Sequence, residues 1–140
     1  MTSIKLFAML APITVVVDVL WIGVLMKRFY LGEIGEIARR EGGSLTPRLG
    51  AAFLVYLVIP AGLILFVRPL LANDARLTSA FFHGALFGFI LYGLYDFTNL
   101  ATLEKWTVRM TIVDVAWGMT LCGAMSVVMA LIDRWLRGQQ

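Results

Sequence analysis

Four apolar stretches, each long enough to cross a lipid bilayer, dominate this sequence. They cover residues 6–26, 49–71, 78–100 and 108–132. A hydrocarbon core about 30 Å thick needs about 20 consecutive apolar residues in a helix. The chain has 140 residues, of which 60% are hydrophobic and 15% charged. A soluble domain of this size needs a more polar surface than this composition can provide. We therefore expect an all-α membrane protein: a single domain, residues 1–140, forming an antiparallel bundle of four transmembrane helices.

The connection between the first two stretches has a pattern of its own. Over residues 29–41, apolar and charged side chains alternate at helical spacing. The apolar ones are Leu31, Ile34, Ile37 and Ala38, and the charged ones are Glu33, Glu36, Arg39 and Arg40. This pattern predicts a short amphipathic helix lying on the membrane surface, with an ordinary structured loop as the alternative.

The distribution of charge restricts the partners of the chain and its orientation. The net charge of +3 comes from connections and termini, which favours contact with lipid headgroups over nucleic acid. Seven lysines and arginines lie on the side of the first and third connections, against five on the other side. The positive-inside rule thus slightly favours a cytoplasmic first connection.

Three aspartates, Asp18, Asp96 and Asp114, interrupt the apolar stretches. A carboxylate at membrane depth is costly, so it usually marks a functional interior. In an antiparallel bundle, the three lie about 13, 12 and 7 Å along the helix axis from the first and third connections. All three therefore belong to the same half of the membrane, where three like charges cannot all ionise cheaply. This placement predicts one polar pocket.

Aromatic and amide side chains accompany these aspartates. Trp21 follows Asp18 by three residues and Trp117 follows Asp114 by three, so each acid and indole share a helix face. In the third stretch, one helix face carries Gly84 and Gly88, which allow a neighbouring helix to approach closely. The same face continues with the polar residues Tyr92, Asp96 and Asn99. The candidate pocket residues are Asp18, Trp21, Tyr92, Tyr95, Asp96, Thr98, Asn99, Asp114 and Trp117.

Several kinds of chemistry find no support in the sequence. His83 is the only histidine and lies about 20 Å from Asp96 along its helix, so we expect no metal site. We also expect no bound cofactor, because there is no haem ligand pair, deep lysine or phosphate-binding loop. The single cysteine, Cys122, is interpreted as a small residue at a helix contact.

The segment YDFTNLATLEKW, the later VDVAWG, and DVLWIG in the first stretch resemble a family of small bacterial membrane proteins. That family is known only as domain of unknown function 2177. The resemblance covers nearly the whole chain and implies four spans in a bacterial inner membrane. It implies no activity.

Three functions remain open. The first is a protein that binds or transports a cation or small polar solute in the acidic pocket; transport would favour a homo-oligomer, because four helices form a thin wall. The second is a membrane enzyme, or enzyme subunit, that acts on lipids. The third is an accessory subunit of a larger membrane complex, in which the polar groups only hold helices together. The sequence does not decide whether the protein is an enzyme.

Overall fold

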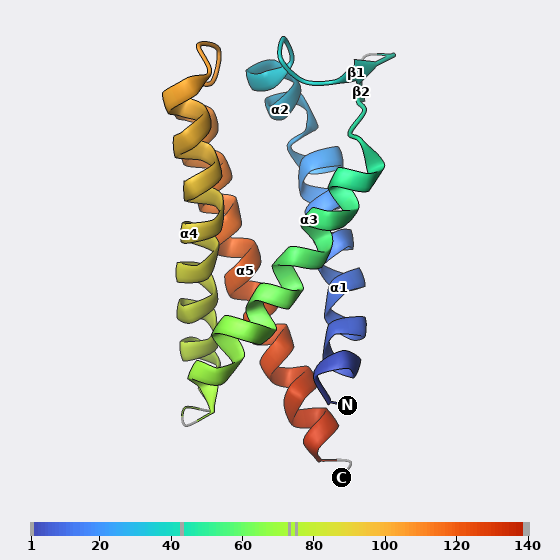
Figure 1. Ribbon diagram of the computed structural model, residues 1–140, viewed down its shortest axis with the longest axis vertical. Coiled ribbons are helices and arrows are strands. Elements are labelled where there is room, and N and C mark those ends of the chain that lie inside the picture. Colours follow the sequence, from blue (N-terminus) through green and yellow to red (C-terminus); the bar gives the residue numbers. More distant parts are fainter. Residues whose placement is uncertain (1, 43, 73, 75, 139–140) are drawn as a thin grey trace.

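The computed structural model describes residues 2–42, 44–72, 74 and 76–138. Within these residues, four helical segments are long and apolar enough to cross a membrane: Ser3–Leu25, Leu49–Leu71, Leu77–Thr102 and Val108–Arg137. They run alternately up and down, so the first segment begins and the fourth ends at the same end of the bundle (Figure 1). The predicted all-α membrane bundle with four spans is confirmed.

The first two spans change helix type before they end. The α-helix α1 (Thr2–Leu20) continues as a π-helical turn, η1 (Trp21–Leu25). Helix α3 (Leu49–Gly62) continues as the π-helical η2 (Leu63–Val67) and the 3₁₀-helical η3 (Arg68–Leu71). Pro60 lies just before these turns, and its missing N–H interrupts the regular hydrogen-bond ladder of the helix.

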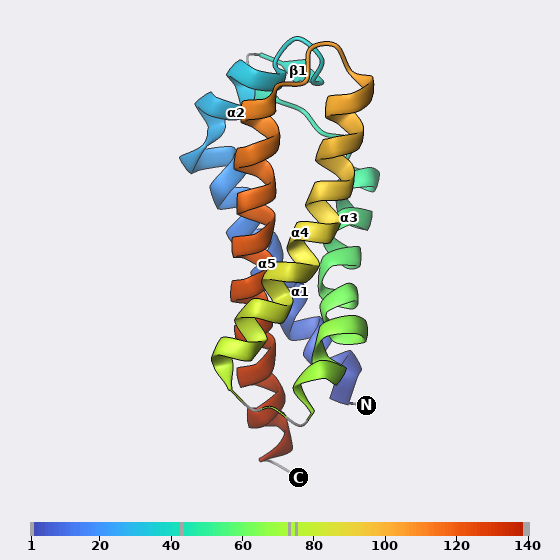
Figure 2. The same cartoon turned by 90° about the vertical axis from the view of Figure 1, so that its left-hand side faces the viewer.

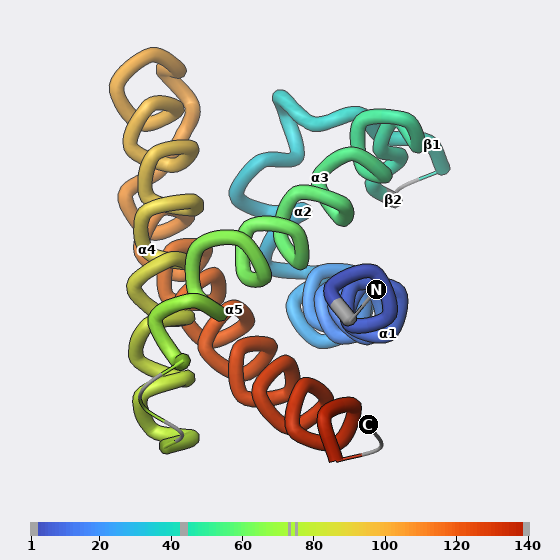
Figure 3. Tube along the Cα trace, turned by 60° about the horizontal axis from the view of Figure 1, so that its bottom comes forward, coloured from blue at the N-terminus to red at the C-terminus, as the bar shows by residue number. Residues whose placement is uncertain are grey.

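The last two spans, α4 (Leu77–Thr102) and α5 (Val108–Arg137), form the closest helix pair (Figure 2). Glycines permit this approach: a Cβ atom on Gly88 would lie only 2.2 Å from the carbonyl oxygen of Gly118. Helix α3 runs diagonally from the side of α1 to the start of α4 (Figure 3). An apolar core joins α1, the second span and α5; its fully buried members include Leu6, Leu10, Ile59, Leu63, Leu121 and Met129.

The first connection differs from the predicted helix over residues 29–41. Helix α2 covers Lys27–Ile34, and a hairpin follows in which β1 (Arg40–Glu41) pairs antiparallel with β2 (Ser44–Leu45). The predicted extent was therefore wrong. Beyond Ile34 the predicted apolar face is not consistently buried, since Ile37 is 44% exposed. Gly42, which follows β1, adopts a φ of 55°, a left-handed conformation that glycine tolerates and that suits a hairpin turn.

The first and third connections pack on each other at the top of the bundle in Figure 1. Tyr30 of α2 is buried against Trp106 and Met110. Glu33 accepts a hydrogen bond from the Thr107 hydroxyl, and Glu36 forms an ion pair with Lys105. This ion pair lowers the pKa of Glu36 from its ordinary value. These contacts fix α2 over one end of the four spans.

Candidate functional site

A cavity of about 550 Å³ lies beneath these connections, inside the bundle. Helices α1 to α5 all contribute to its wall, and most of the lining is apolar. Three lining residues of α3, Leu54, Val55 and Val58, are more than half exposed on the outside of the bundle, as is Tyr95 of α4. Helices α3 and α4 diverge toward this end (Figures 1 and 3), and these exposed lining residues come from both of them.

Asp18 lies on the α1 side of the cavity and is 5% exposed. Its Oδ1 accepts a hydrogen bond of 2.7 Å from the Trp117 indole, and its Oδ2 accepts one of 3.1 Å from the Tyr56 hydroxyl. The Trp117 ring stacks on that of Trp21, with centroids 4.2 Å apart and planes inclined by 5°. The acid is thus oriented by neutral donors from α3 and α5.

Asp114 enters the same cavity from α5 and is 7% exposed. The Tyr30 hydroxyl donates a hydrogen bond of 2.5 Å to its Oδ1. Burial, and then the nearby Asp114 charge, raise the pKa of Tyr30 above its ordinary value. Tyr30 therefore keeps its proton and remains a donor to Asp114.

Asp96 lies on α4, fully buried behind the cavity wall. Its carboxyl group is close enough to that of Asp114 for the two to interact. Among the described residues, no donor makes a well-formed hydrogen bond to either Asp96 oxygen, although the Trp106 indole is nearby. The structure thus brings the three aspartates together, with Asp18 and Asp114 at the cavity and Asp96 behind Asp114.

The other candidate residues lie at different distances from the cavity. Tyr92 and Tyr95 line it, and the Tyr95 ring packs edge-on against Trp106. Asn99 is half-buried and does not line it. Thr98 lies on the outside of α4, where its hydroxyl donates to the Leu94 carbonyl. A turn of 100° per residue already places Thr98 opposite Asp96 on the helix.

Sequence reasoning did not select Tyr30, Tyr56 or Trp106. Tyr30 and Tyr56 donate hydrogen bonds to Asp114 and Asp18, and both Tyr30 and Trp106 line the cavity. Tyr56 was detectable in principle, because it is the one tyrosine in a second span that is apolar apart from Arg68 near its end. Tyr30 gave no comparable signal, since its contact with Asp114 joins residues 84 positions apart.

The lining of the cavity has an acidic part, formed by Asp18 and Asp114, and an apolar part. Within the residues that the structure describes, no lysine, arginine or histidine lines the cavity. Nor do the described residues include a group of three histidine, cysteine or acidic side chains suited to a metal ion. The cavity can therefore accept a group that supplies hydrogen-bond donors or positive charge, attached to an apolar body.

The chain belongs to a family described as "Predicted membrane protein (DUF2177)", whose model matches residues 3–131. The comparison with curated proteins gave no match, and neither did the comparison with solved structures.

Proposed function

We propose that this protein binds, within a bacterial inner membrane, an amphiphilic molecule whose polar end carries an amine or another cationic donor. The observation that carries the proposal is the cavity of about 550 Å³ with Asp18 and Asp114 in its wall. A pocket of this size suits a small organic ligand. The apolar lining contacts the body of the ligand, and the two carboxylates accept hydrogen bonds from its polar end.

The exposed part of this apolar lining supports an amphiphile over a fully water-soluble solute. Leu54, Val55 and Val58 are both exposed and part of the lining, so an apolar chain can enter from the lipid without crossing a polar surface. An organic cation also fits better than a metal ion, because a metal needs a convergent set of oxygen ligands that this largely apolar wall does not supply.

The experiment uses quenching of tryptophan fluorescence by brominated dodecylamine, with brominated dodecanol as the uncharged probe. Trp106 lines the cavity, and Trp135→Phe removes the signal of a tryptophan that is 55% exposed. In this background, the amine should quench at a concentration about tenfold lower than the alcohol, as expected from one charge-assisted hydrogen bond of about 1.5 kcal/mol.

Substitutions test whether the preference for the amine depends on the two aspartates of the cavity. Asp114→Asn and Asp18→Asn preserve side-chain shape and should remove the preference for the amine. Glu104→Gln removes an exposed carboxylate at the same end of the protein and should leave the preference intact. Val58→Phe fills the cavity and should weaken both probes.

Equal quenching by amine and alcohol in the parent protein would contradict the proposal. If the two Asn variants then lost only thermal stability, the aspartates would be interhelical contacts, as in an accessory subunit.

A further inference from the structure

A second cavity, of about 160 Å³, lies at the opposite end of the bundle, where α1 begins and α5 ends. Its charged lining comes from the end of the second span, the connection before α4, and the last turns of α5. These residues are Arg68, Arg76, Arg134, Arg137, Asp74 and Asp133. Four arginines and two aspartates give this lining a net charge of +2.

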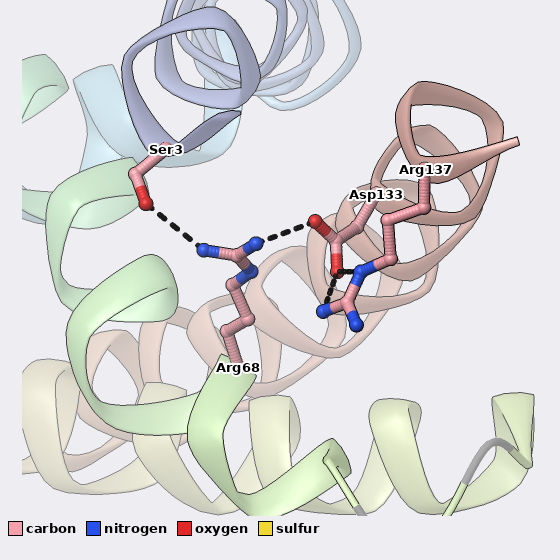
Figure 4. Close-up of polar contacts among 4 residues, drawn as sticks. All are labelled: Ser3, Arg68, Asp133 and Arg137. Carbon is pink, nitrogen blue, oxygen red and sulfur yellow. Dashed lines mark hydrogen bonds and ion pairs between the residues drawn. The ribbon is translucent and has the colours of Figure 1, made fainter. Parts of the chain in front are cut away.

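Arg68 is fixed in position by two other helices. Its Nη1 donates to the Ser3 hydroxyl over 2.9 Å, and its Nη2 donates to Oδ1 of Asp133 over 2.7 Å (Figure 4). Its Nε is buried and has no hydrogen-bond partner among the residues that the structure describes. A buried donor without an acceptor is costly, and an oxygen-rich ligand would satisfy it.

Both carboxylate oxygens of Asp133 already accept hydrogen bonds from arginines. Arg137 donates from Nε and Nη2 to its Oδ2, while Arg68 occupies its Oδ1 (Figure 4). One carboxylate thus faces two guanidinium groups and cannot neutralise both. Asp74 accepts two guanidinium hydrogen bonds, of 3.0 and 2.9 Å, from Arg76.

The depth of this cavity suggests the source of the missing acceptor. Arg68 lies three residues before the end of the second span, and Arg137 is the last residue of the fourth. Span ends lie at the headgroup layer, where lipid phosphates are concentrated. Planar guanidinium groups bind phosphate oxygens in pairs of hydrogen bonds.

From this geometry we infer that the arginine-lined cavity binds a phosphate group at the headgroup layer. The cavity volume suits the phosphate itself rather than a whole lipid, so any acyl chains would lie outside it against the helices. The inference concerns the opposite end of the protein from the acidic cavity and does not depend on the proposed function.

The test measures thermal unfolding of the full chain in neutral maltoside micelles, with chloride keeping the ionic strength constant. The probes are dihexanoylphosphatidylglycerol, dihexanoylglycerol, which lacks the phosphate, and inorganic phosphate. We expect the phospholipid to raise the melting temperature and dihexanoylglycerol to leave it unchanged. Stabilisation by inorganic phosphate as well would identify a soluble phosphate as a ligand; stabilisation by the phospholipid alone would identify a headgroup.

Arg68 also links helices, so the substitutions are made at exposed arginines of the lining. Arg134→Gln and Arg137→Gln should each weaken the apparent affinity about tenfold. Arg28→Gln, an exposed arginine at the other end, should not change it. The inference fails if no phosphate compound stabilises the protein beyond its control, or if Arg28→Gln weakens binding as much as the two lining variants.

Discussion

The Trp117 indole donates a 2.7 Å hydrogen bond to the Asp18 carboxylate, joining two residues that are 99 positions apart in the chain. The same indole stacks on Trp21, one helical turn beyond Asp18. A single side chain of α5 therefore both orients an acid of the first span and packs against that span. The contact that orients Asp18 in the acidic cavity therefore also contributes to the stability of the bundle.

Trp117→Phe should accordingly destabilise the protein by about 1–3 kcal/mol, the cost of removing one partner of a buried hydrogen bond. Phenylalanine keeps part of the ring stack, so the loss reports mainly the missing N–H. Thermal or denaturant unfolding in micelles measures the change. Trp135→Phe makes the same substitution at a residue that is 55% exposed, and it should have little effect. Equal losses in both variants would show that the bond to Asp18 contributes nothing.

The four spans were predictable because length and hydropathy suffice to identify a membrane helix. The common depth of Asp18, Asp96 and Asp114 needed only the order and direction of these helices. The hydrogen-bond donors to the aspartates were harder to predict, since Tyr30 and Tyr56 reach Asp114 and Asp18 only through tertiary packing. The end of α2 could not be predicted either, because the amphipathic pattern continues into residues that form a hairpin. Local periodicity cannot show where a helix loses its packing partner.

Tyr30→Phe should loosen the attachment of α2 to the bundle. The substitution removes the hydroxyl that donates to Asp114, while the ring can still pack against Trp106 and Met110. We expect faster hydrogen exchange in the backbone amides of residues 27–34, with little change in the α4–α5 pair. Tyr95→Phe serves as the comparison, because the Tyr95 side chain is 58% exposed. Unchanged exchange in α2 would mean that apolar packing alone secures it.

Asp74 provides a test by pH at the opposite end of the bundle. Hydrogen bonds from the Arg76 side chain, then from Ser79 and the Arg76 backbone, hold the pKa of Asp74 well below its ordinary value of 3.8. A carboxylate with a lowered folded pKa stabilises the protein above the ordinary value, and this contribution disappears as pH falls through the folded pKa. Asp74→Asn should therefore lower the melting temperature at pH 7, and the difference from the parent should shrink as the pH falls below about 4.

Glu41→Gln is the control for Asp74→Asn, because Glu41 is exposed in the hairpin at the other end. It should change the melting temperature little across the same range. A difference between Asp74→Asn and the parent that stays constant down to pH 2 would show that the hydrogen bonds of Asp74 do not depend on its charge.

Gly88→Ala tests the close contact between α4 and α5. An added Cβ would lie 2.2 Å from the Gly118 carbonyl oxygen and 2.9 Å from the Cys122 Cβ, so the two backbones would have to separate. Overpacking of this kind costs about 1–3 kcal/mol, which unfolding in micelles should detect. Gly50→Ala is the matched control, because a Cβ there meets nothing within 4 Å and alanine favours the helix. Gly50→Ala should be neutral or stabilising; if Gly88→Ala behaved in the same way, the α4–α5 pair would not depend on glycine at this position.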